Sequence, residues 1–300
     1  MTDSQGRLLL VGDNPFHGIS HISQERASQR GQLIREPQYA ADIVTTALRN
    51  GAGGFTFTVD DTTLEIVRLL SKNEFDFIPR LYAFVPYTYE YVRLAVSLGG
   101  IPGLARKIAT QILLSGNTKA ILHGIRGGLT TDPSDVYKAY LYYEVGRIRA
   151  AARKTSSLNC VFVHEVVTDM ALALDMKWLF NSHIAAMNEL GIRPGFHTRN
   201  LPFLLEKFGQ WKINSGTIIL TTPFNAIGMQ MNPSKLEAEQ ALREANKFEI
   251  IVFGILAGGL LQLDEAMSYI DRLTNVNGIA VGVSKKEQAK ETFKFISSRK

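Results

Sequence analysis

Short apolar runs alternate with amphipathic stretches along most of the chain. The C-terminal part shows the pattern most clearly: an apolar run from Glu249 to Leu256 ends in Ala257-Gly258-Gly259, and a helical pattern follows from Leu260 to about Leu273. A second β-type run, Gly278 to Val283, then precedes a lysine-rich helix. Continuous apolar strands joined by amphipathic helices predict a parallel sheet covered by helices.

The same alternation upstream brings the number of predicted strands to eight. The upstream strands are Leu8 to Gly12, Phe55 to Val59, Phe77 to Val85, Cys160 to Val166, Arg193 to His197 and Thr217 to Thr222. Helical sequence follows each of them, so the pattern predicts an α/β protein with a (β/α)8 TIM barrel in a single domain, residues 1–300. The main competitor is an open doubly wound sheet, but its usual sign, Gly-x-Gly-x-x-Gly after the first strand, is missing.

The alternation breaks between Tyr87 and Ser157, a stretch too long for one helix and its turns. Helical patterns cover Leu104 to Leu114 and Val136 to Arg153, while the run Ala120 to His123 can be read as a strand or as part of a helix. Turn residues on both sides of that run favour the helix. We therefore expect a helical insertion after the third strand, about 87–157, over or beside the barrel mouth, where it could act as a lid.

Composition is ordinary for a soluble globular protein, with 45% hydrophobic and 20% charged residues. The net charge is +5, and we expect the excess to be spread thinly along the chain, with a modest concentration at Lys285, Lys286 and Lys290. This distribution is compatible with an anionic small-molecule ligand and does not indicate a nucleic-acid binding surface. Neither a signal peptide nor an apolar run of spanning length is found, so we expect a cytoplasmic protein without a membrane partner. The single cysteine, Cys160, lies in a predicted strand and is expected to be a buried hydrophobe. Nothing in the sequence indicates the oligomeric state.

Polar residues gather at the predicted strand ends, which meet at one mouth in a parallel barrel. The residues expected there are Asp13, His17, Asp60, Asp61, His164, Glu165, His197, Arg199, Asn225 and Ser284, with Arg80 pointing inward from the third strand. Four of them have structural alternatives. Asp60 can cap the next helix, His164 can be a hydrogen-bonded core histidine, His17 can be loop-exposed, and Glu165 can point away because strand neighbours alternate faces. His21, His123 and His183 are expected to be surface or helix histidines.

Glycines after the last two strands are typical of a phosphate cradle. Gly258 and Gly259 allow close backbone approach, and Gly282-Val283-Ser284 opens a helix whose free N–H groups favour an anion. Lys285 and Lys286 would add positive charge. The alternative is tight loop packing, with both lysines facing solvent and Ser284 capping the helix.

The second half of the chain resembles the aldo-keto reductases. Val161-Phe162-Val163-His164 is similar to the family's strand-four histidine, and Gly195-Phe196-His197-Thr198 to the strand and turn after it. Gly254 to Leu261 looks like the family's Gly-rich Leu-Leu segment, and Gly282 to Gln288 like its cofactor-phosphate loop.

The resemblance implies NADP as cofactor. It implies a cofactor site at Gly258, Gly259, Gly282, Ser284, Lys285 and Lys286, and a catalytic site at Asp60, Arg80 and His164. Asp13, His17, His197, Arg199 and Asn225 would bind the substrate.

The first half departs from the family's Asp-Tyr-Lys-His tetrad. Residues 61–65 contain no tyrosine, and Arg80 stands in the nearest context to the strand-three lysine. In the family the tyrosine supplies a proton to the carbonyl and the lysine lowers its pKa. The resemblance therefore supports the fold more than the reaction.

Three functions remain open at this point. The first is an NADP-dependent oxidoreductase of aldo-keto reductase type acting on a small molecule. The second is a metal-assisted hydrolase, lyase or isomerase, with a divalent metal held by Asp13, His17, His164, Glu165 and His197. The third is a non-catalytic barrel that binds a small ligand, anionic or phosphate-bearing.

Overall fold

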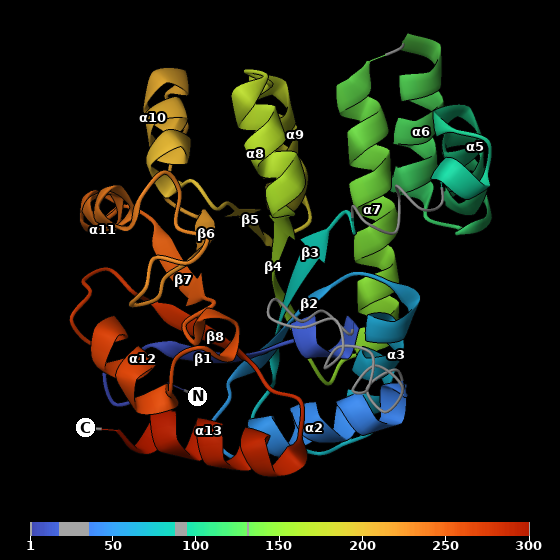
Figure 1. The fold of residues 1–300 in the computed structure, drawn as a ribbon. Helices are drawn as coiled ribbons and strands as arrows, with labels where there is room; N and C mark the ends of the chain where they lie inside the picture. Colours follow the sequence, from blue (N-terminus) through green and yellow to red (C-terminus); the bar gives the residue numbers. More distant parts are fainter. Residues whose placement is uncertain (1, 18–35, 88–94, 131, 300) are drawn as a thin grey trace.

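A closed barrel of eight parallel strands, β1 to β8 in chain order, forms the centre of the molecule (Figure 1). The computed structural model describes residues 2–17, 36–87, 95–130 and 132–299. The strands are β1 (Leu8–Gly12), β2 (Gly54–Thr58), β3 (Arg80–Val85), β4 (Ser157–Val163), β5 (Arg193–His197), β6 (Ile219–Pro223), β7 (Glu249–Phe253) and β8 (Gly278–Gly282). The first and last strands pair from Leu8↔Gly278 to Gly12↔Gly282, which closes the sheet. The predicted TIM barrel is confirmed.

Side chains fill the inside of the barrel, so it is a packed core and not a pore. The inner cluster consists of Leu8, Leu10, Tyr82, Cys160, Phe162, Ile219 and Ile251. Gly195 belongs to this layer because a Cβ there would lie 2.3 Å from the Phe162 ring. Cys160 is fully buried, as predicted, and burial raises the pKa of its thiol well above the usual value.

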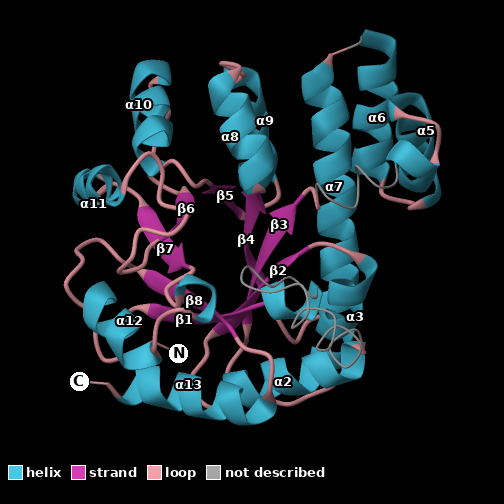
Figure 2. Ribbon diagram, viewed as in Figure 1, coloured by secondary structure: helices cyan, strands magenta, loops and turns pink. Residues whose placement is uncertain are grey.

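Helices surround the strands in the arrangement that the alternating pattern predicts (Figure 2). They are α2 (Pro37–Arg49), α3 (Asp61–Leu70), α8 (Glu165–Ala173), α9 (Lys177–Glu189), α10 (Leu201–Trp211), α11 (Lys235–Glu244), α12 (Leu263–Ile270) and α13 (Lys286–Ser298), with short 3-10 turns η1 (Asn14–His17) and η2 (Ala257–Gly259). Phe55 and Phe57 of β2 face outward into the apolar layer beneath these helices. No helix in the described ranges has the length and apolar character needed to cross a membrane.

Extra helices follow β3, as predicted. They are α5 (Ile101–Leu114), α6 (Thr118–Thr130) and α7 (Pro133–Ala152). The run Ala120 to His123 lies inside α6, so its helical reading is right. Figure 1 shows α5 and α6 against the outer side of α7, at the edge of the molecule and away from the strands. The described part of the insertion therefore lies beside the barrel and does not cover its mouth.

The region around β4 differs from the prediction. The strand ends at Val163 and not at Val166, and residues 165–173 form α8, where no helix was expected before Asp175. The β-branched pair Val166-Val167 extended the apolar run and hid the boundary. His164 ends the strand by accepting a hydrogen bond at Nδ1 from the Val166 N–H, 3.3 Å away, which makes it the N-cap of α8.

Candidate functional site

Two predicted histidines meet at the mouth of the barrel. His164 follows β4 and His197 ends β5, and their ring centroids are 5.8 Å apart in an edge-on arrangement. Phe84 and Phe253, near the ends of β3 and β7, lie against the His197 ring with centroid distances of 5.0 and 4.7 Å. The strand ends thus bring two imidazoles together, and that of His197 packs against two phenylalanines, neither of which the sequence interpretation had singled out.

Glu165 joins the histidines to a cation. Its Oε2 lies 3.0 Å from His197 Nε2 and accepts a 2.9 Å hydrogen bond from Arg199 Nε, while Arg199 Nη2 donates to Oε1. The expectation that Glu165 can point away from the mouth is wrong, because Glu165 begins a helix and does not continue a strand. Burial acts to raise the pKa of Glu165, but the contacts with His197 and Arg199 outweigh it and hold that pKa far below its ordinary value.

Asp169 supports this arrangement from the next turn of α8. Its carboxylate accepts hydrogen bonds from Thr198 Oγ1 and from the Arg199 backbone N–H, the latter at 3.2 Å. Burial raises the pKa of Asp169. The sequence interpretation missed this residue. Its signal is the spacing of four from Glu165, which puts both carboxylates on one helix face once α8 is recognised.

His197 has the clearest unfilled bonding capacity at the mouth. Both of its ring nitrogens are buried, and neither makes a hydrogen bond with any residue that the structure describes. Glu165 Oε2 lies 3.0 Å from His197 Nε2, but the direction of this approach does not suit a hydrogen bond. Even if the ring turned to bond Glu165, the other nitrogen would remain unpaired. A buried polar atom without a partner costs about 1–3 kcal/mol, which a bound ligand or water would recover.

His164 is uncharged at neutral pH. Burial, followed by the neighbouring His197, lowers its pKa to about 4. Because Nδ1 accepts from the Val166 N–H, the proton of the neutral ring belongs on Nε2. The ring therefore presents a neutral N–H donor.

The aspartates after β1 and β2 hold the local backbone. Asp13 is buried, and its Oδ2 accepts the Thr58 N–H at 2.6 Å, which ties the loop after β1 to the end of β2. Asp60 caps α3 by accepting the Thr63 N–H at 2.7 Å, so the capping alternative for Asp60 is confirmed. Asp61 is exposed and pairs with Arg147 of α7. His17 ends η1, and its side chain lies outside the described part of the structure.

Two predicted site residues have other positions. Arg80 is the first residue of β3 and pairs with Gly54 and Ser157, the first residues of their strands, so it lies at the opposite end of the barrel from His164. The strand begins three residues later than predicted, which moves Arg80 from its interior to its start. Asn225 follows β6, but its amide bonds its own loop: Oδ1 accepts from Met229 N at 2.8 Å and Nδ2 donates to Met229 O at 2.9 Å.

The loops after β7 and β8 have the glycine geometry expected of a close backbone approach. Gly258 and Gly259 have φ angles of 72° and 98°, in the left-handed region that favours glycine. Gly282 ends β8 beside Pro15, and a Cβ on it would lie 3.1 Å from the proline ring. A side chain at Gly282 would therefore fill the space against this ring.

The lysines at the start of α13 have different surroundings. Lys286 Nζ lies 2.7 Å from Asp42 of α2, so its charge is directed away from the strand ends. Lys285 is the N-cap residue and is exposed, with no ion pair to a described residue. The Ser284 N–H donates to Gln288 Oε1 at 3.0 Å, and Ser284 is not the N-cap. Of the two predicted phosphate-binding lysines, Lys285 alone has an uncommitted charge.

A metal centre does not form among the described side chains. No group of three or more His, Cys, Asp or Glu residues in those ranges is arranged to hold a metal ion. Glu165, one of the five candidate ligands, is already held by Arg199. Of the set Asp13, His17, His164, Glu165 and His197, the side chains that the structure describes do not form a ligand shell.

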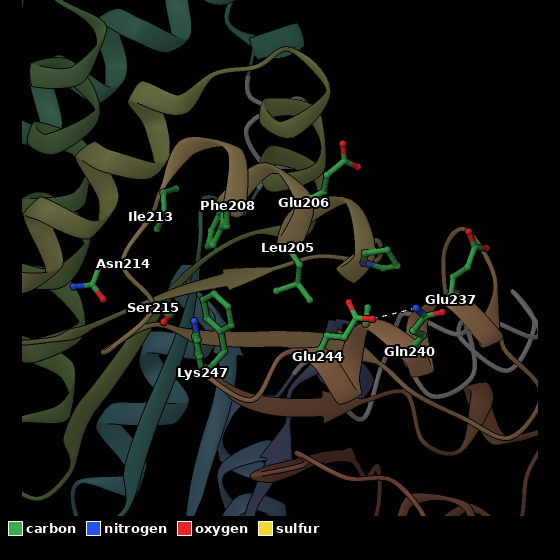
Figure 3. Close-up of a pocket in the computed structure, with 14 residues that line it drawn as sticks. Leu205, Glu206, Phe208, Ile213, Asn214, Ser215, Glu237, Gln240, Glu244 and Lys247 are labelled. Carbon is green, nitrogen blue, oxygen red and sulfur yellow. Dashed lines mark hydrogen bonds between the residues drawn. The ribbon is translucent and has the colours of Figure 1, made fainter.

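A groove of about 770 Å³ lies between α10 and α11, on the outside of the barrel (Figure 3). Phe208 and Phe248 contribute to its lining, and Glu206 and Glu244 are among its polar residues. None of the strand-end residues named above lines it. Three neighbouring groups with shifted pKa values, His164, Glu165 and Asp169, lie at the mouth instead, and we therefore place the candidate site there.

No known sequence family matches the chain, and no curated protein is similar to it in sequence. Two solved structures of a protein from Pseudomonas aeruginosa, described provisionally as an aldo-keto reductase, are similar in fold. Both have a TM-score of 0.58 and 13% identity over 96% of this chain, covering 89% and 88% of theirs. A tryptophan synthase complex from Pyrococcus furiosus matches with a TM-score of 0.43 and 11% identity, over 99% of this chain and 96% of that one. The two Pseudomonas structures support the barrel fold and do not define the reaction.

Proposed function

We propose that the protein is a barrel enzyme that acts on a small carbonyl compound at the mouth, as an NADP-dependent oxidoreductase of aldo-keto reductase type. The observation that carries the proposal is His197, whose two buried ring nitrogens have no hydrogen-bond partner among the described residues. The oxygen of a small molecule beside the His197 ring would supply the missing partner. The fold similarity to the Pseudomonas protein supports the same class.

The residues at the mouth divide the work between polarising and positioning. His164 offers a neutral Nε2–H, which can donate to a carbonyl oxygen without bringing a full charge. Glu165 lies beside the His197 ring, and Arg199 neutralises the carboxylate. Because residues 61–65 hold no tyrosine, the proton that the carbonyl oxygen needs would come from a mouth histidine.

The loops after β7 and β8 fit a phosphate-bearing cofactor. Gly258, Gly259 and Gly282 leave the backbone open to close approach, and Lys285 keeps a free charge beside the start of α13. NADPH bound there would supply the hydride for the carbonyl carbon. Ser284 and Lys286 contribute less, since each is engaged by another side chain.

A second candidate is a lyase or isomerase that moves protons without nicotinamide. The close Glu165–His197 contact favours it, because a carboxylate that orients an imidazole is a common acid–base arrangement. A metal-assisted form would require side chains beyond the described ones. A barrel that only binds its ligand is the third outcome to be separated by experiment.

A fluorescence titration of the purified protein with NADPH tests the proposal. We expect the parent protein to bind NADPH saturably. The affinity of Gly282→Asp for NADPH should be lower by roughly tenfold or more, because the new carboxylate would repel the cofactor phosphates. Metal analysis of the same preparation distinguishes the metal-assisted alternative. If the parent protein does not bind NADPH, the oxidoreductase proposal fails, and turnover without cofactor would favour the lyase or isomerase.

A further inference from the structure

The positive charge of the chain is concentrated in one segment. The full sequence has 33 Lys and Arg and 28 Asp and Glu residues. Residues 91–131 contain five cations (Arg93, Arg106, Lys107, Lys119 and Arg126) and no Asp or Glu. The remaining 28 cations equal the 28 anions, so this segment accounts for the whole excess of +5. The view that the excess is thinly spread is therefore corrected.

Exposed apolar side chains concentrate in the same region. Fifteen large hydrophobic residues are exposed in the described part of the chain, and seven of them lie between Val96 and Val136. Leu114 is 82% exposed, Leu122 66% and Leu113 58%. A soluble protein tolerates scattered exposed leucines, but their concentration in a short segment indicates an interaction surface.

The helices α5 and α6 present these side chains away from the protein. Ile112 and Ala120 are buried in a small core with Ala139 and Tyr142 of α7, so one side of each helix is used for packing. Leu113 and Leu114 end α5, and Leu122 lies one turn into α6, on either side of the connection 115–117. Figure 1 shows both helices at the outer edge of the molecule.

Cations accompany the exposed leucines. Arg106 lies two turns before Leu114 on α5 and is exposed, and neither it nor Lys107 makes an ion pair with a residue in the described ranges. Lys119 and Arg126 of α6 have anionic partners, Glu189 at 3.5 Å and Asp135 at 3.0 Å, but their side chains stay 53% and 67% exposed. The patch formed by α5 and α6 is thus apolar and cationic.

We infer that the α5–α6 patch docks on a membrane surface that contains anionic lipids. Amphipathic helices with lysine or arginine on the polar side and leucine on the apolar side lie in the interface, with their apolar side chains among the acyl chains. The anionic headgroups would meet Arg106 and Lys107, while Leu113, Leu114 and Leu122 enter the apolar region. Such docking needs no spanning length. It therefore differs from the expectation of no membrane partner, which rested on the lack of a spanning run.

The absence of anions from residues 91–131 favours lipid over a second copy of this chain. Two copies that met through α5 and α6 would bring eight cations together without a carboxylate from these helices to compensate them. Like charges at a desolvated contact oppose association. An anionic bilayer offers the opposite charge over its whole surface, and each lysine or arginine near it adds to the binding.

Co-sedimentation with lipid vesicles tests the inference. We expect the parent protein to bind phosphatidylcholine–phosphatidylserine vesicles, to bind phosphatidylcholine vesicles much less, and to be released by added salt. Leu114→Glu should weaken binding at least tenfold, and the double variant Arg106→Gln/Lys107→Gln roughly tenfold. Leu236→Glu is the matched control: Leu236 is a 71% exposed leucine on α11, outside the patch, and its variant should bind like the parent.

Because all the replaced side chains lie at the surface, we expect each variant to fold like the parent protein. Its circular dichroism spectrum and thermal transition check this. The inference is overturned if the parent protein does not bind the anionic vesicles, or if Leu114→Glu binds them as tightly as the parent. Sedimentation velocity tests the competing explanation, in which the patch is a contact between two copies of the chain. A dimer that Leu114→Glu dissociates, together with no vesicle binding, would identify the patch as a contact between copies of the chain.

Discussion

His197 Nε2 lies 3.0 Å from Glu165 Oε2, so the last residue of β5 and the first residue of α8 are in close contact at the barrel mouth. Arg199, two residues beyond His197, holds the same carboxylate through two donors. The contact places a carboxylate beside the ring of His197 and leaves at least one of its nitrogens for a ligand. The predictions below follow from this arrangement and from the loops around it.

Replacing Glu165 with Gln should destabilise the protein by about 2 kcal/mol or more, because it leaves Arg199 without its anion and His197 without its charged neighbour. Urea denaturation measures the free energy of unfolding. Arg68→Gln is the control, since Arg68 and Glu65 form an exposed pair on α3 and its loss should cost less than about 1 kcal/mol. Equal effects of the two substitutions would contradict the structural role given to Glu165.

The free energy of unfolding should fall as the pH is lowered from about 6.5 to 4.5. Burial lowers the pKa of both His164 and His183 to about 4 in the folded protein. The unfolded chain, with ordinary histidines near 6.5, then binds more protons than the folded chain in this window, so acid favours unfolding. Glu165 has a lower pKa in the folded protein than in the unfolded chain, where it is near 4.5. Its carboxylate therefore stabilises the folded protein above that pH, and this contribution is lost only as the pH falls below it.

His183 allows the pH effect to be divided. It is fully buried beneath β4, where Nε2 lies 2.9 Å from Val161 O and Nδ1 3.2 Å from Tyr137 OH. His183→Gln should lower stability at pH 7 and also reduce the pH-dependent loss by about half. Thermal melts of both proteins at a series of pH values measure this. A pH-independent stability of the parent protein between 6.5 and 4.5 would show that the two rings are not held neutral.

The two lysines of the proposed phosphate site should differ in their effect on NADPH binding. Lys285→Ala should weaken binding about threefold to tenfold and reduce its dependence on salt, because this charge has no described ion-pair partner. Lys286→Ala should change it little, since that charge is paired with Asp42. Fluorescence titrations at two salt concentrations make the comparison. A larger loss in Lys286→Ala would place the phosphate elsewhere.

The sequence predicted the fold because each strand is a short apolar run bounded by glycine or polar residues. The predicted strand bounds were correct where glycine or polar residues clearly flank the strand, as for Leu8–Gly12 and Arg193–His197. They failed after β4, where Val166 and Val167 extend the apolar run into α8. Because of that error, Glu165 was treated as a strand residue that can point away from the mouth. A helix and a strand present their side chains with different periods, so the direction expected from a strand does not hold for a residue that begins a helix.

The site was predicted only in part, for a physical reason. The sequence gives the strand ends and hence His164 and His197, but it does not show which polar groups are already bonded. Asn225 lies at a strand end and yet bonds Met229, and Lys286 begins a helix and yet pairs with Asp42. These partners depend on how loops and neighbouring helices meet, which periodicity does not encode.

The most direct test of the account is the rate at which the protein oxidises NADPH in the presence of small aldehydes and ketones, compared with the rate of His197→Phe. Phenylalanine keeps a ring between Phe84 and Phe253 but removes both ring nitrogens. We expect turnover by the parent protein and a decrease in kcat/KM of about 100-fold or more in the variant, with an unchanged Kd for NADPH. Equal rates for the two proteins would contradict the assignment of the mouth, and of His197 within it, as the functional site.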